Sequence, residues 1–407
     1  MRGLVIVALL CAAPSWAQVF EGDQLQPVFS DKGLFTEAVV GASVVTSTAT
    51  VAPSAGAVLD VVDDAEVQFA QLLWWGSADA PDRDVAFTLP GGTTLTLSAQ
   101  VTAGSDPCSV VGTDFHYFQC ALDLSAELMA LPSLDGEYLM SGLTPSVAAP
   151  WYIDSASCVS SSQACSLYVG AFALVLVYRD PADPTVRSVS VSSGLLRTQF
   201  IGDDIGAALP PFEMQGGGGS LTVVALEGDR EFPAPGTCDG TIDDVDAAGL
   251  PQCDVVALCR GTCASNRSIW QLTASDVVAT PTNADNPVGN VFNETAADPF
   301  ARRSGVDGDE ANSLDIDTFD LQGVLPDGVY PDLTTGVQVG GDTVLMTLVV
   351  VAVDDVSPIV GEGEGEGEGE GEGEGEGEGE GEGEGEGEGE GEGEGEGEGE
   401  GEGEGEG

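Results

Sequence analysis

The chain has 407 residues, with 11 Lys and Arg against 69 Asp and Glu, and a formal net charge of −58 at pH 7. Such a surface repels phosphate backbones and anionic lipid, which are bound through Lys and Arg patches, so nucleic acid is excluded as a partner. Divalent cations and cationic surfaces fit this charge better. The length allows two ordinary domains plus terminal segments.

The first 17 residues have the pattern of a secretory signal peptide. In MRGLVIVALLCAAPSWA, one Arg precedes an apolar core, and small residues stand at Ser15 and Ala17. We therefore expect export through the general secretory pathway, with cleavage before Gln18 and a secreted or cell-surface location. Lipid attachment at Cys11 is a lesser alternative.

Residues 18–182 predict a first β-sandwich domain. Runs rich in Val, Thr and aromatic residues are separated by turn residues, which is typical of sandwiches and barrels. Ala121–Leu131 is the best helix candidate in this half. Eleven mostly apolar residues, Tyr168–Tyr178, indicate a central strand buried on both faces. This run is too short to cross a membrane as a helix, which takes about 20 residues.

A polar turn, Arg179–Pro184, leads into a second predicted β-sandwich domain, residues 183–356. Strands are expected near 186–191, 195–201 and 221–227, and a Cys-rich insertion occupies 233–268. The last apolar run, Thr343–Val353, matches the first in length. Because long helices are missing from the pattern, the predicted fold class is all-β, with two tandem antiparallel, jelly-roll-like β-sandwiches.

Residues 357–407 predict a disordered acidic linker, which alternates strictly between Gly and Glu from Gly361. It has no side chain able to bury apolar surface, so it cannot offset the entropy cost of folding. Neighbouring carboxylates lie ~7 Å apart, within the ~8 Å Debye length, so they repel and extend the chain. It is either a charged spacer or a harmless repeat expansion. We expect it to continue into further C-terminal domains of a longer parent protein.

Eight cysteines remain after the signal peptide, and an even number in an exported chain favours disulfides. Local spacing favours the pairs Cys108–Cys120 and Cys158–Cys165. The last four cysteines pair among themselves in one of three ways, which the sequence does not distinguish. A zinc site is disfavoured because paired C-x-x-C spacing and a nearby His are missing. These four are Cys238, Cys253, Cys259 and Cys263.

An acidic segment, Asp307–Asp317, is the candidate metal site. Calcium takes six to eight oxygen ligands, which a loop rich in Asp and Asn can supply. The four named candidates are Asp307, Asp309, Asp315 and Asp317. The alternative is a solvated acidic loop. A second stretch, Asp239–Asp246, matches an EF-hand loop poorly, because its opening positions lack carboxylates.

No catalytic residues are predicted. The single histidine, His116, lies among aromatic residues beside Cys120, without a G-x-S-x-G motif, which favours a packing role. Trp74 and Trp75 could offer a sugar-stacking face. Neighbours in a strand point opposite ways, so we expect one tryptophan in the core and the other at most partly exposed.

Several short motifs follow one another in a fixed order along the chain. They are LVLVYRDP (174–181), V-x-V-x-x-G (189–194), EGD (227–229), GNVFN (289–293), NSLDID (312–317) and GGDTVLMTLVVVAVD (340–354). Together they resemble a domain of unknown function found in large exported surface proteins of bacteria and archaea. The resemblance spans about Val67–Asp355, excludes the Cys-rich insertion, and implies a paired β-sandwich envelope module without assigned catalytic residues.

The sequence therefore predicts a non-catalytic structural or adhesive module of the cell envelope. Its expected partners are envelope or extracellular matrix components, glycans among them. Calcium is the one cofactor considered. A calcium-dependent glycan-binding module is the first alternative, and a hydrolase that uses two carboxylates is the second.

Overall fold

In the computed structural model, the described residues all belong to one compact unit, Met1–Ile359. The second unit, Val360–Gly407, which holds most of the predicted acidic linker (residues 357–407), lies outside them. Among the described residues, no helix is long and apolar enough to span a membrane. The structure describes residues 21–46, 49–112, 116–148, 168–198, 202–204, 209, 211–215, 217–226, 253–260, 265–266, 271–272, 277–284, 286, 291–293, 300, 303–304, 313–339 and 344–357.

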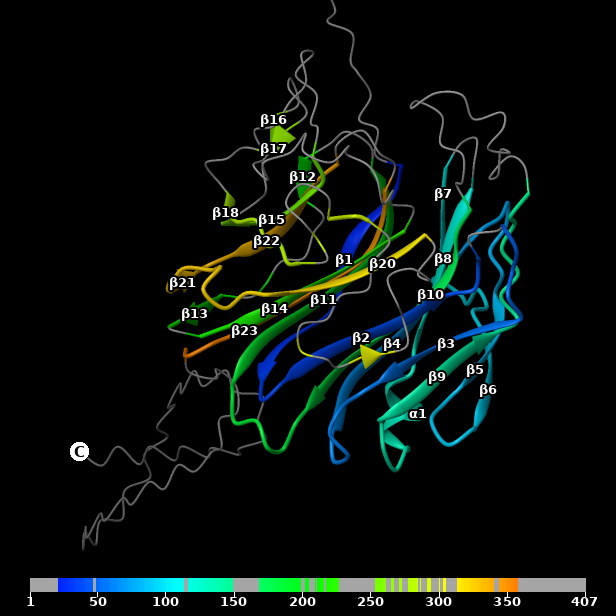
Figure 1. Ribbon diagram of the computed structural model, residues 1–407, viewed down its shortest axis with the longest axis horizontal. Helices are drawn as coiled ribbons and strands as arrows, with labels where there is room; N and C mark the ends of the chain where they lie inside the picture. Colours follow the sequence, from blue (N-terminus) through cyan, green and yellow to red (C-terminus); the bar gives the residue numbers. More distant parts are fainter. Residues whose placement is uncertain are drawn as a thin grey trace, which may run out of the picture. The chain divides into compact units, whose positions relative to one another are not determined.

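The fold is all-β, with two antiparallel β-sandwiches, as the sequence predicted (Figure 1). The first sandwich consists of two five-stranded sheets, here called sheets 1 and 2. Sheet 1 contains, in spatial order, β19 (Arg303–Ser304), β3 (Ser54–Leu59), β9 (Gly136–Ser141), β5 (Asp84–Thr88) and β6 (Thr94–Ser98). Sheet 2 contains β2 (Thr36–Ser43), β10 (Gly170–Arg179), β4 (Glu66–Ser77), β8 (Tyr117–Asp123) and β7 (Cys108–Val111).

The second sandwich consists of sheets 3 and 4. Sheet 3 contains β1 (Glu21–Gly33), β11 (Arg187–Thr198), β23 (Val344–Asp354), β14 (Gly219–Leu226) and β20 (Leu314–Asp320). Sheet 4 contains β12 (Gly202–Asp204), β22 (Leu333–Gln338), β15 (Val255–Arg260) and β18 (Val277–Ala279). Two short ribbons pair β13 (Phe212–Met214) with β21 (Gly328–Tyr330), and β16 (Ser265–Asn266) with β17 (Gln271–Leu272).

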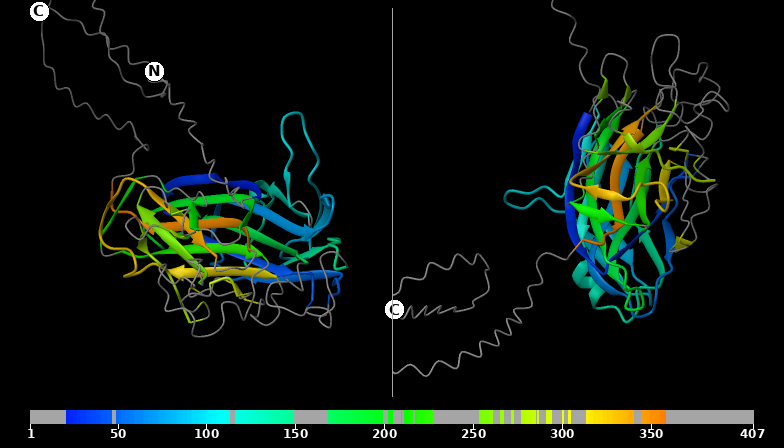
Figure 2. Two further views of the ribbon diagram at one scale, coloured as in Figure 1. Left: turned by 90° about the horizontal axis from the view of Figure 1, so that it is seen from above. Right: turned by 90° about the vertical axis from the view of Figure 1, so that its left-hand side faces the viewer.

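The sheets form successive layers, and the long strands of both sandwiches run roughly side by side (Figure 2). Sheets 1 and 2 meet where Phe87 packs edge-on against Phe172, with ring centroids 5.7 Å apart. Sheets 2 and 3 approach closely at Gly41, where an added Cβ would lie 2.8 Å from Cδ1 of Ile316. Apolar side chains of sheets 3 and 4 share a second core. Sheets 2 and 3 are therefore both covered on their two faces.

The two apolar runs that the sequence singled out are central strands, as predicted. β10 lies between β2 and β4, and every residue before Arg179 is buried. β23 lies between β11 and β14, and every residue before Asp354 is buried. A strand covered on both faces has no polar side, which explains the continuous apolar sequence.

The predicted boundary at residues 182 and 183 needs amendment, because strands cross it in both directions. β1 lies in the range of the first domain, yet it pairs with β11 in sheet 3 from Glu21↔Arg197 to Gly33↔Arg187. β19 lies in the range of the second domain, yet it pairs with β3 in sheet 1. Local apolar periodicity reports burial and not the identity of the pairing strand, so the sequence could not reveal this exchange.

The helix prediction for Ala121–Leu131 is mostly wrong. Its first residues belong to strand β8, which pairs with β4. The helix itself, α1, spans only Ser125–Met129, and Leu128 is its buried residue. The first part of the run alternates as well as a strand does, and tertiary pairing with β4 decides the outcome.

One predicted disulfide is confirmed, and it joins two neighbouring strands. Cys108 of β7 lies opposite Cys120 of β8, and their sulfur atoms are bonded. Cys253 and Cys259 are also disulfide-bonded. Cys158, Cys165, Cys238 and Cys263 fall outside the described residues, so the predicted Cys158–Cys165 pair stays a prediction.

Replacing both Cys108 and Cys120 with serine is expected to lower the free energy of unfolding by about 3 kcal/mol. The bond closes a loop with a sequence separation of 12, and loops of that size restrict the unfolded chain by about this amount. Guanidinium denaturation of the two proteins measures the difference. A loss below about 1 kcal/mol would show that the β7–β8 ladder holds this edge without the bond.

Candidate functional site

Two of the four predicted calcium ligands are buried, and the other two lie outside the described residues. Asp307 and Asp309 lie outside the described residues. Asp315 and Asp317 lie on β20 and are 1% and 0% exposed. The backbone N–H of Asn293 donates a hydrogen bond to Oδ2 of Asp315 at 2.6 Å. Both described candidates are thus inside the second sandwich, where any ion held by them would be a structural one.

The described ranges contain no group of three or more His, Cys, Asp or Glu side chains arranged to hold a metal ion. Asp315 and Asp317 share one face of β20 with the buried Phe319, since alternate residues of a strand point the same way. Their carboxylates therefore do not form a surface that could bridge calcium to a glycan.

Melting temperatures measured with calcium and with a chelator are expected to agree within about 1 °C. The reason is that Asp315 already accepts a backbone hydrogen bond in a buried position. A structural calcium ion at a concentration 100 times its Kd would instead add about 2.7 kcal/mol of stability. A rise of several degrees with calcium would overturn this expectation and indicate a bound structural calcium ion.

The side chain of His116 is partly exposed and lies beside an exposed acid. Its Nδ1 is 3.4 Å from Oδ1 of Asp79, and the two side chains are 37% and 86% exposed. Both side chains are in contact with water, so the contact contributes little to stability. The sequence predicted a packing role for His116 among aromatic residues, whereas in the structure its side chain is partly exposed to water.

Both tryptophans are fully buried, which agrees with the expectation that one lies in the core and the other is at most partly exposed. Nε1 of Trp74 donates to the carbonyl oxygen of Asp82 at 2.8 Å. Nε1 of Trp75 donates to Oε1 of Gln119 at 2.7 Å. They point to opposite faces of sheet 2, and each face is covered by another sheet, so neither can stack on a sugar.

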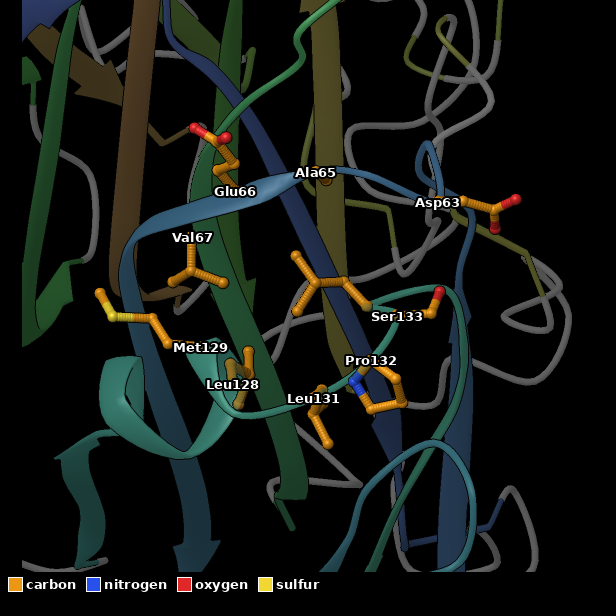
Figure 3. A pocket seen from close by; sticks show the side chains of 10 residues that line it. Asp63, Ala65, Glu66, Val67, Leu128, Met129, Leu131, Pro132 and Ser133 are labelled. Carbon is orange, nitrogen blue, oxygen red and sulfur yellow. The ribbon is translucent and has the colours of Figure 1, made fainter.

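A small hollow of about 240 Å³ lies between α1 and the start of β4 (Figure 3). Apolar side chains such as Val67, Leu128 and Leu131 line it. Figure 3 shows the carboxylates of Asp63 and Glu66 at its edge, directed away from these side chains. A ligand site of this size usually has polar groups that converge on the ligand. The floor of this hollow is apolar, and the carboxylates at its edge do not converge on a common point.

Asp355, just after β23, is the centre of a buried polar network. Oδ2 of Asp355 lies 2.9 Å from Nζ of Lys32 and accepts a hydrogen bond from the hydroxyl of Ser188 at 2.7 Å. Oδ1 accepts hydrogen bonds from the backbone N–H groups of Glu213 and Ser357 and from the Ser357 hydroxyl. Lys32, the single lysine of the chain, also donates to the hydroxyl of Ser357 at 2.6 Å.

Sequence reasoning did not identify this network. Its two charged members are separated by more than 300 positions, and neither lies in a recognisable motif. The side chains of Lys32 and Asp355 are 14% and 0% exposed, so the pair is largely removed from water. The available signal was the presence of a single lysine in so acidic a chain.

Burial by itself would raise the pKa of Asp355. Hydrogen bonds from Ser357 and the Glu213 amide, together with those from Lys32 and Ser188, outweigh it and lower the pKa to about 2. A carboxyl group whose pKa falls on folding stabilises the native state above its unfolded pKa of about 4, and that stability is lost as the pH falls toward 2.

We expect the stability gap between the wild type and Asp355→Asn to be constant from pH 7 to 5 and to shrink between about pH 4 and 2. The pKa of about 2 corresponds to a change on the order of 2 kcal/mol. Denaturant titrations of both proteins at each pH measure the gap, and the comparison cancels the effect of the many other carboxylates. A gap that stays constant down to pH 2 would contradict this account.

A second ion cluster lies beside the first. Nε of Arg187 is 3.0 Å from Oδ1 of Asp354, and its Nη1 is 2.8 Å from Oδ2 of Asp183. The same Nη1 donates to the carbonyl oxygen of Phe35. Arg187 thus connects the end of β23 to the linker between the sandwiches and to the β1–β2 turn. The described partners in both clusters are residues of the strands and of the segments that join them. Both clusters therefore stabilise the fold.

No family model matches the chain, and no curated protein does. Among solved structures, PNGase F, a glycosylasparaginase from Flavobacterium meningosepticum, is 10% identical, covers 80% of this chain and 97% of its own, and has a TM-score of 0.21. PNGF-II is 10% identical over 79% of this chain and 65% of its own, with a TM-score of 0.20. A structure of the Sputnik virophage is 12% identical over 87% and 91%, with a TM-score of 0.17. Similarities this low carry no argument about function.

Proposed function

We propose that this chain is an exported structural or adhesive module of the cell envelope, without catalytic activity. The observation that carries the proposal is the position of β23. This strand lies in the middle of sheet 3, pairs with β11 on one side and β14 on the other, and is buried up to Asp354. The Gly-Glu sequence begins at Gly361, after six further residues.

A central strand is a strong point of attachment, because two hydrogen-bond ladders must break before it can leave the sheet. β23 also contributes to both apolar cores, with Leu348 in the first and Val349 in the second. Force on the following segment therefore enters the body at a buried central strand that both cores share. This is what a module held at a surface by its C-terminal segment needs.

The export part of the proposal is supported by the N-terminal pattern and by the disulfides. Disulfides persist in oxidising compartments and are rare in the cytosol. Cys108–Cys120 closes an edge of sheet 2, and Cys253 and Cys259 are bonded as well. Partners of the module would be envelope or matrix components, which an acidic surface contacts through cationic groups or bridging cations.

Antibody labelling of intact producing cells tests the location. We expect intact and permeabilised cells to label equally, and a variant lacking residues 1–17 to label only after permeabilisation. Labelling of the wild type only after permeabilisation would overturn the proposal. Turnover of any member of a polysaccharide panel by the purified protein would overturn its non-catalytic part.

A further inference from the structure

The first sandwich is inserted, in sequence, between two strands that pair with each other. β1 ends at Gly33 and β11 begins at Arg187, and these two residues are partners in sheet 3. Strands β2 to β10, which with β19 make up the first sandwich, all lie in the chain between them. As long as the β1–β11 ladder is intact, the ends of this inserted segment are held side by side.

The strands at the two ends of the described body run in the same direction in sheet 3. β1 and β23 are both antiparallel to β11, so they are parallel to each other. Glu21 lies at the Arg197 end of β11, whereas Asp354 lies at its Arg187 end. Tension applied through the two chain ends therefore pulls β1 and β23 in opposite directions along their axes. It loads the hydrogen bonds of each ladder together instead of one pair at a time.

Two ion pairs oppose the same movement. Lys32 near the end of β1 is paired with Asp355 just beyond β23, at 2.9 Å. Arg187 at the start of β11 is paired with Asp354 at the end of β23, at 3.0 Å. Sliding β23 out along its axis would separate both pairs. It would also remove the Asp355 carboxylate from its partners, which is costly for a buried charge.

We propose that β1, β11 and β23, fastened by Lys32–Asp355 and Arg187–Asp354, form a terminal clamp that carries tension and keeps it from the first sandwich. The shortest mechanical path between the chain ends crosses these three strands and omits residues 36–186. The clamp gives a mechanical basis to the proposed envelope role, on which its biological use rests. Its physical properties can be tested without that role.

Stretching single molecules of the chain from Gln18 onward, with handles at both ends, tests the clamp. We expect the first major event to be rupture of sheet 3, and release of residues 36–186 to follow it. An earlier, weaker event that lengthens the chain by about 500 Å, the extended length of residues 36–186, would overturn the proposal.

A pair of variants sharpens the test. Lys32→Met is expected to raise the rate of the first event at fixed force at least about tenfold, which corresponds to about 1.4 kcal/mol of barrier. Arg179→Gln removes an ion pair between β10 and β4 of sheet 2 in which both side chains are about half exposed, and is expected to leave that rate unchanged. Equal rates for Lys32→Met and the wild type would overturn the role of Lys32.

Met140→Ala creates a cavity in the first sandwich, where Met140 is fully buried. We expect it to lower the melting temperature and to leave the force of the first event unchanged, because the clamp shields this sandwich. A lower first force would overturn the proposal even if Lys32→Met cannot be purified folded. Failure of the force tests leaves the surface-labelling result intact, and failure of surface labelling leaves the force results intact.

Discussion

Lys32→Met is expected to lower the free energy of unfolding at pH 7 by about 3–5 kcal/mol. The substitution leaves the Asp355 carboxylate buried and ionised without its cationic partner, and removing one member of a buried pair costs about this much. The Asp355 side chain is 0% exposed, so water cannot take the place of the lysine without opening the structure. Guanidinium denaturation measures the loss.

The double variant Lys32→Met/Asp355→Asn is expected to regain part of the lost stability. Asparagine keeps a side-chain oxygen for the amides of Glu213 and Ser357 but carries no charge. Arg179→Gln, at an exposed pair, is expected to change stability by no more than about 0.5 kcal/mol. If the double variant is less stable than Lys32→Met, the cost does not come from an uncompensated buried charge.

Trp75→Ala is expected to cost about 3–5 kcal/mol, and Trp74→Ala a similar amount. Both side chains are 0% exposed, and truncation of a buried tryptophan leaves a large cavity. Trp75→Ala also removes the donor that pairs with Oε1 of Gln119, a buried amide. Thermal and chemical denaturation of the two variants measure these losses.

The comparison between the two tryptophans tests the layered arrangement. They lie next to each other on β4 and point to opposite faces of sheet 2. If one face of the sheet were open to water, one of the substitutions would cost well under 1 kcal/mol. Met129→Ser provides the control, because Met129 is 58% exposed and its loss should have little effect.

Features that depend on local composition were predictable from the sequence. Continuous apolar runs identified β10 and β23 as central strands, and both are buried on two faces. The β5–β6 hairpin, which pairs Thr88 with Thr94, is likewise local, because the turn residues Pro90-Gly91-Gly92 lie between its two alternating strands. Short cysteine spacing gave Cys108–Cys120. Each of these is encoded within about a dozen neighbouring residues.

Features that depend on distant partners were not predictable. β1 is mostly polar, and nothing in its sequence indicates that it pairs with β11 across the whole first sandwich. Lys32 and Asp355 meet only because β1 and β23 share a sheet. The burial of Asp315 and Asp317 likewise depends on β20 joining sheet 3 beside β14. A loop rich in acids and a buried acidic strand have the same local sequence, and tertiary pairing separates them.

Hydrogen exchange of the intact chain is the most direct test of the central claim that β1 belongs to the second sandwich. We predict that the amides of β1, β11 and β23 open with one common free energy, and that Lys32→Met lowers it for all three while the amides of β4 and β8 keep theirs. If the amides of β1 instead follow those of β4 and β8, the shared sheet and the clamp built on it are contradicted.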